Sequence, residues 1–97
     1  MLNKYESIYI VKPEVEEQGI KELIEKFNAL IETAGGKVSE VQEWGLKRLA
    51  YPIQKKEQGY YVLVNFEANP ESIVELERVY KITDSVMKFI TIRKDEE

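Results

Sequence analysis

The chain has 97 residues, 43% of them hydrophobic and 33% charged, so it can bury one modest core and is too apolar to be disordered. It contains no cysteine and no histidine, which excludes disulfides and thiolate metal sites and removes the commonest general base. The net charge of −4, from 14 basic and 18 acidic residues, taken alone disfavours nucleic acid as a partner.

The first third of the chain predicts a strand followed by a long amphipathic helix. Residues 4–11 are rich in the β-branched and aromatic side chains that strands prefer. Pro13 suits the first turn of a helix, and the acids after it complement the helix dipole. Gly35 and Gly36 are typical of a helix end. Between them, apolar residues recur at spacings of three and four: Ile20, Leu23, Ile24, Phe27, Leu30, Ile31 and Ala34.

The middle of the chain predicts two strands joined by a polar turn. One strand begins near Lys37 and runs towards Tyr51, with a bulge at Gly45. Pro52 should end regular pairing or hold an edge position, because proline has no N–H to donate. Residues 54–59 form the turn, and residues 60–67 alternate apolar side chains in the strongest strand pattern of the sequence.

The last third predicts a second helix and a final strand. Asn69 suits the N-cap position and Pro70 the first turn. Residues 83–85 break the helix, and residues 86–93 form the strand. Residues 95–97 are a short acidic tail that we expect to fray. The side chains expected to face inward from this helix are Ile73, Leu76, Val79 and Tyr80.

The order of elements, β-α-β-β-α-β, predicts an α+β fold of the ferredoxin-like kind, formed by residues 1–97 as a single domain. In this arrangement a four-stranded antiparallel sheet carries both helices on one face. No apolar run approaches the ~20 residues that cross a bilayer, and the N-terminus does not read as a signal peptide. We therefore expect a cytoplasmic protein without membrane contact.

The helix-free face of such a sheet should be polar at every second strand position. Instead, alternation leaves four large apolar side chains there: Ile8, Ile10, Tyr61 and Leu63. On the last strand, Met87 and Phe89 compete with Ile90 and Ile92 for the core, and the losing pair joins this face. A contiguous apolar surface usually marks an interaction site. The alternative is a solvated face shaded by long lysine and glutamate stems.

Charge is segregated along the chain. Residues 44–56 carry Lys47, Arg48, Lys55 and Lys56 and no acid, with Trp44 and Tyr51 among them. Acids instead crowd the two predicted helices, at Glu16, Glu17, Glu22, Glu25, Glu32, Glu71, Glu75 and Glu77. Cations neutralise phosphates and aromatic rings stack on unpaired bases, so this hairpin could bind RNA. On charge alone, however, the favoured interpretation is a solvated strand whose charges prevent aggregation.

Two further functions are compatible with this fold. A regulatory domain that binds a metabolite would need a polar pocket at a dimer interface. A small enzyme would need clustered acids or a nucleophile pair, which the absence of histidine and cysteine disfavours. We therefore predict no enzyme activity, no catalytic residue, no cofactor, no metal site and no small-molecule substrate.

The sequence resembles the bacterial small-subunit ribosomal protein six (S-six) family in one register over essentially its whole length. The run from Trp44 to Ile53, WGLKRLAYPI, carries the resemblance most specifically. The segments at residues 4–6, 59–60 and 81–84 resemble the family too. The resemblance implies a structural constituent of the small ribosomal subunit. It further implies that this chain binds the central domain of small-subunit ribosomal RNA as a heterodimer with ribosomal protein S-eighteen, and so supports subunit assembly and translation.

The same resemblance suggests which residues contact each partner. Lys47, Arg48 and Tyr51 are the first candidates for RNA contact, and Lys4 and Lys88 join them at positions that are often basic in relatives. The apolar helix-free face is then our candidate for the surface that the partner protein covers. This set is Ile8, Ile10, Tyr61, Leu63, Ile90 and Ile92.

The sequence departs from the family pattern at two places, and both concern properties known in relatives. Asn3 stands where relatives commonly have a basic residue, so we expect a weaker N-terminal RNA contact. Some relatives have a long acidic tail modified by added glutamates, whereas this chain stops at Glu97.

Overall fold

The computed structural model describes residues 2–94, so the predicted acidic tail at 95–97 lies outside the described residues. The observed element order is the predicted one. The elements are β1 (Asn3–Val11), α1 (Glu17–Thr33), β2 (Lys37–Ile53), β3 (Lys56–Ala68), α2 (Pro70–Ile82) and β4 (Val86–Arg93). Neither helix in the described part of the chain is long and apolar enough to span a membrane.

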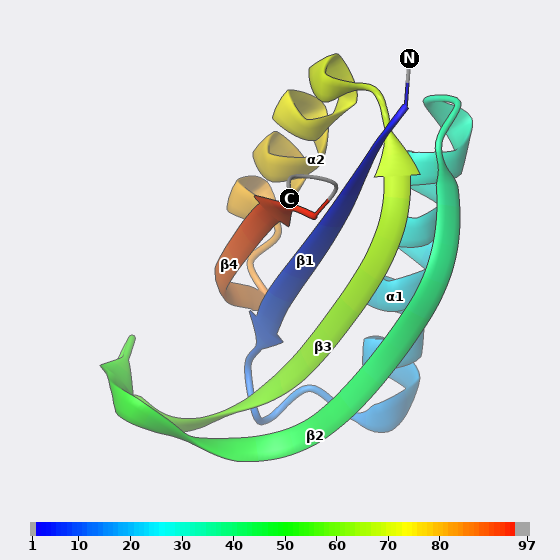
Figure 1. Ribbon diagram of the computed structural model, residues 1–97. Helices are drawn as coiled ribbons and strands as arrows, with labels where there is room; N and C mark the ends of the chain where they lie inside the picture. Colours follow the sequence, from blue (N-terminus) through cyan, green and yellow to red (C-terminus); the bar gives the residue numbers. More distant parts are fainter. Residues whose placement is uncertain (1, 95–97) are drawn as a thin grey trace.

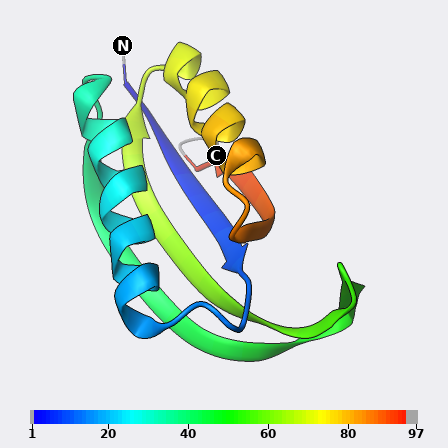
Figure 2. The ribbon, with the colours of Figure 1, turned by 180° about the vertical axis from the view of Figure 1, so that it is seen from behind.

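The four strands form one antiparallel sheet in the order β2-β3-β1-β4. Figure 1 views the sheet with both helices behind it, and Figure 2 shows α1 and α2 side by side on that one face. The ferredoxin-like α+β fold predicted from the sequence is therefore confirmed. Both described helices leave the opposite sheet face uncovered, and the β2–β3 hairpin extends well past the end of β1 (Figure 1).

The core lies between the sheet and the helices and is centred on aromatic rings. The rings of Tyr9, Phe27 and Tyr80 pack with centroids 4.8–5.2 Å apart. The buried Ser7 hydroxyl lies 2.9 Å from the Tyr80 hydroxyl and 3.1 Å from that of Thr91, so the polar atoms of this core are paired. The apolar stripe of α1 is buried as predicted, through Ile20, Ile24, Phe27 and Ile31.

Helix α1 begins at Glu17, and the prediction that it opens at Pro13 is wrong. The Lys12 N–H donates to the Ser85 carbonyl at 2.9 Å, which ties the chain to the start of β4. The Val15 N–H then closes a turn on the Lys12 carbonyl at 3.2 Å. Because Val15 packs against the core, this turn positions the helix over the sheet before its first regular bond forms.

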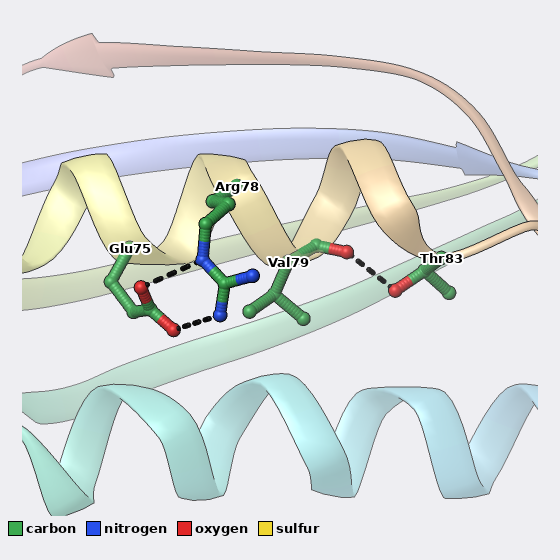
Figure 3. Close-up of polar contacts among 4 residues, drawn as sticks. All are labelled: Glu75, Arg78, Val79 and Thr83. Atoms are coloured by element: carbon green, nitrogen blue, oxygen red, sulfur yellow. Dashed lines mark hydrogen bonds and ion pairs between the residues drawn. The ribbon is translucent and has the colours of Figure 1, made fainter.

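Helix α2 begins at Pro70 as predicted, but the Asn69 side chain makes no cap hydrogen bond within the described chain. Instead, the N–H and the hydroxyl of Ser72 donate to the Asn69 carbonyl at 3.0 and 2.7 Å. Figure 3 shows two later contacts of this helix. Arg78 donates to both carboxylate oxygens of Glu75, and the Thr83 hydroxyl donates to the Val79 carbonyl at 2.5 Å. The Thr83 contact satisfies a carbonyl in the last turn, where intrahelical donors run out.

Candidate docking surface

The extended β2–β3 hairpin, residues 47–59, is called the arm below. Its strands pair at Lys47 with Gly59 and at Arg48 with Gln58, and the register is then interrupted until Ile53. Pro52 lies in the interrupted stretch, as expected of a residue that cannot donate to the ladder. The middle of the arm therefore depends on side-chain contacts for its position.

The arm turns on two non-glycine residues with left-handed backbones. Gln54 has φ of 52° and Lys55 has φ of 66°, and the flanking residues Ile53 and Lys56 pair with each other. Two-residue hairpin turns with positive φ at both positions match strand twist and favour Asn-Gly. Glutamine and lysine are strained there, so the turn is held by the arm around it.

The arm packs against the helix-free face at its base. A side chain at Gly59 would collide with the Ile10 Cγ2 atom and would lie 2.9 Å from the Met87 Cε atom. Leu49 reaches the same spot and is buried. A small apolar cluster of Ile10, Leu49 and Met87 around Gly59 therefore fastens the base of the arm to the sheet.

Beyond this cluster, the arm and the sheet enclose a groove of about 300 Å³. Its walls are largely apolar, and among residues 2–94 Lys88 is the one charged residue that lines it. The sheet contributes Ile8, Ile10, Tyr61, Lys88, Phe89 and Ile90, and the arm contributes Leu49, Ala50, Tyr51 and Ile53. The metabolite-binding alternative requires a polar pocket, and this groove is not one.

Lys88 and Tyr51 bridge the two walls of the groove, since Lys88 belongs to the sheet and Tyr51 to the arm. The Lys88 ammonium donates to the Tyr51 hydroxyl at 2.7 Å and lies 5.2 Å from the centroid of the same ring. The hydrogen bond to Tyr51 raises the pKa of Lys88, because it favours the charged ammonium. Two residues predicted as separate RNA contacts thus contact each other.

The predicted partner-face residues all belong to the helix-free side, but they are not equally exposed. Ile90 and Ile92 are 56% and 48% exposed. Ile10 and Leu63 are only 8% and 5% exposed, so the expectation that they form open surface is wrong. The arm covers Ile10, and Leu63 lies between its cross-strand neighbours on β1 and β2. Ile8 and Tyr61 are half-buried between these extremes.

A bulge in β4 settles which of its residues face the helices. Val11 pairs with Val86 and Ile10 with Lys88, so Met87 is an extra residue that reverses the alternation. Val86 is buried in the core, and the Phe89 ring packs 5.0 Å from the Tyr80 ring. In β4, the side chains that face the core therefore stand at even-numbered positions before the bulge and at odd-numbered positions after it. Ile90 and Ile92 therefore lie on the helix-free side, a position that alternation alone leaves open.

The arm cations do not form one compact cluster. Because successive strand residues point to opposite faces, Lys47 and Arg48 project to opposite sides of the arm. Arg48 lies 3.9 Å from Glu57, a contact between two exposed side chains that holds neither firmly. Lys47 and Lys55 make no ion pair with any residue of the described chain, and both are exposed.

Lys56 is the arm cation that forms a close ion pair with a residue outside the arm in the described chain. Its ammonium lies 2.8 Å from a carboxylate oxygen of Glu14, in the turn before α1. The hydrogen bond from Lys56 lowers the pKa of the Glu14 carboxyl. This pair links the second strand of the arm to the turn before α1.

Lys4 lies far from the arm. Lys4 lies opposite Glu67 of β3 in the strand register, near the start of β1. The arm meets β1 at Ile10, near the other end of the strand. Ile10 follows Lys4 by six positions along the strand, or roughly 20 Å at the usual rise per residue. The predicted RNA contacts therefore lie at both ends of the sheet and do not form a single site.

Trp44 belongs to this surface, although the predicted partner face omits it. Its ring stacks on that of Tyr61, with centroids 6.3 Å apart and an interplanar angle of 14°. The indole N–H donates to the Gln42 side chain at 3.0 Å, and the residue is 41% exposed. Trp44 is the extra residue of the bulge beside Gly45, whose φ is 87°. The bulge predicted at Gly45 is thus confirmed, and it turns Trp44 onto the helix-free face.

Fold and surface together define a class of protein: a ferredoxin-like α+β chain with a helix-free sheet face and a basic arm. The sequence matches the family described as Ribosomal protein S6 over residues 4–93, and the chain belongs to that family. The resemblance found in the sequence is thereby confirmed. This is a family of structural ribosomal proteins and not of enzymes.

Relatives and solved structures agree with this assignment. Proteins named small ribosomal subunit protein bS6 from Caldanaerobacter subterraneus subsp. tengcongensis and Clostridium novyi are each 48% identical over 95 residues. Each alignment covers 98% of this chain and 100% of the relative. The crystal structure of 30S ribosomal protein S6 from Thermotoga maritima superposes with a TM-score of 0.91 at 30% identity, covering 97% of this chain and 89% of that one.

Proposed function

We propose that this chain is a structural, non-catalytic constituent of the bacterial small ribosomal subunit. It binds the central domain of small-subunit ribosomal RNA together with ribosomal protein S-eighteen, as a heterodimer, and supports subunit assembly and translation. It works in the cytoplasm, in the assembled subunit. Family membership and the names of the relatives support the ribosomal part of this proposal.

One observation carries the RNA-binding part: the arm presents cations that no acid of the described part of the chain neutralises closely. Lys47 and Lys55 are exposed and have no ion-pair partner in the described chain, and Arg48 has only a long contact to Glu57. Such charges attract phosphates and release counterions on binding. They would orient the protein on RNA whose shape and unpaired elements are read elsewhere in the complex.

The helix-free face supports the protein-binding part. Ile90, Ile92 and Trp44 remain exposed on it while its centre is buried, so a partner would cover two apolar margins and the groove between arm and sheet. Large exposed apolar side chains gathered on one face usually mark an interface. The partner protein then buries this face while the arm reaches the RNA beside it.

Replacing Lys47 and Arg48 by alanine tests the RNA contact. In the presence of S-eighteen, we expect the slope of log affinity against log salt to flatten by roughly 0.7–0.9 for each phosphate that is no longer neutralised. The measurement is binding to a central-domain RNA fragment across a salt series. Replacing Lys26 and Lys81, two exposed lysines on the helix side, by alanine removes equal charge and should leave the slope nearly unchanged. An unchanged slope in the arm variant would remove both residues from the RNA site.

A further inference from the structure

We propose that Tyr51 and Lys88 form a clip that holds the arm over the helix-free face and so positions the cations of the arm. Both are then positioning residues, in place of the separate RNA contacts that the sequence suggests. The clip is a property of the free protein. Only its consequence for RNA binding rests on the proposed function.

The clip joins two parts of the chain that differ in how firmly they are held. Lys88 lies within β4 and pairs with Ile10 of the neighbouring strand, so its backbone is fixed by the sheet. Tyr51 lies in the stretch between Arg48 and Ile53, where the β2–β3 register is interrupted. A hydrogen bond of 2.7 Å and a cation–ring distance of 5.2 Å link the two side chains. The clip thus supplies a tether where the backbone ladder is broken.

Other contacts of the arm do not replace this tether. Leu49 fastens its base, and Lys56 braces the returning strand through Glu14 at 2.8 Å. Among the residues that the structure describes, Tyr51–Lys88 is the one side-chain hydrogen bond that links residues 49–55 to the sheet. The strained turn at Gln54 and Lys55 adds no stability of its own. Without the clip, the outer arm would lose its fixed distance from β4.

Backbone relaxation of the free protein tests the clip directly. In the wild type, we expect order parameters for residues 49–55 near those of rigid backbone, about 0.85, falling below about 0.6 in Lys88→Met or Tyr51→Leu. Tyr51→Phe keeps the ring and removes the hydroxyl, so it should give an intermediate reduction. Lys88→Arg retains a donor and a cation and should preserve order. Combining Lys88→Met with Tyr51→Leu should loosen the arm no further than either change alone.

RNA binding separates positioning from direct phosphate contact. With S-eighteen present, Lys88→Met should weaken binding roughly three- to tenfold, because the arm occupies its competent position less often. The salt slope should stay at the wild-type value, whereas removal of a residue that touches a phosphate would flatten it by roughly 0.7–0.9. Two results in Lys88→Met would overturn the clip. One is wild-type order parameters for residues 49–55, and the other is a flatter salt slope while the arm stays ordered. Absence of RNA binding in every variant would instead count against the proposed function and leave the relaxation result standing.

Discussion

Gly59 is the residue on which the seating of the arm depends. Any Cβ atom at this position would collide with the Ile10 Cγ2 atom and approach Met87 to 2.9 Å. Overpacking of this kind is costly because the surrounding side chains must leave their preferred rotamers. A single methyl group should therefore displace the arm from the sheet.

We predict that Gly59→Ala lowers the free energy of unfolding by roughly 1–3 kcal/mol. Urea denaturation monitored by circular dichroism measures the change. The neighbouring Gln58→Ala is the matched control, since Gln58 is exposed and its truncation should alter stability by less than about 0.5 kcal/mol. Equal stability of the two variants would mean that the arm does not rest on Ile10.

The direction of individual strand side chains is only partly predictable from the alternation in the sequence. Strand parity correctly sends Tyr9 and Val11 to the core, because β1 is regular along most of its pairing with both neighbours. Parity could not place Ile90 and Ile92, because the bulge at Met87 reverses the alternation within β4. Nor could it predict the burial of Ile10, which follows from contact with an arm residue 49 positions away in the chain.

At the scale of elements, the arm is the least regular part of the sheet. The hairpin itself is predictable from its polar turn and from Pro52. Its closure over the sheet is not, because that depends on the twist of two long strands and on the contact between Tyr51 and Lys88. The predicted start of α1 is wrong for a similar reason: a tertiary bond from Lys12 to Ser85 overrides the local preference of Pro13 for a helix.

We predict that the double substitution Gln54→Asn with Lys55→Gly strengthens the arm. Asn-Gly adopts two positive φ angles readily, so the change should relieve roughly 1–2 kcal/mol of backbone strain. The slowing of hydrogen exchange at the amides of Ile53 and Lys56 measures the gain. Lys55→Ala, which removes the side chain and keeps the left-handed backbone strained, is the control and should not slow exchange. Faster exchange in the Asn-Gly variant would contradict the turn geometry.

For the whole molecule, distribution of charge matters more than its sum. The net charge of −4 disfavours RNA binding, yet acids crowd the helices, while the arm carries lysines that form no ion pair within residues 2–94. One face of the molecule can therefore meet a polyanion while the other repels it. The apolar margins at Ile90 and Trp44 on the helix-free side are suited to a protein partner in the same complex.

The proposal that the arm binds RNA while the apolar face binds a protein is tested most directly by measuring affinity for central-domain ribosomal RNA with and without S-eighteen. Alone, the chain offers the RNA a few dispersed cations, and we expect weak, strongly salt-dependent binding. With its apolar face covered by S-eighteen, it should bind at least about tenfold more tightly, a gain of about 1.4 kcal/mol. Equally tight binding without the partner would contradict the proposal that sheet face and arm act as one docking surface.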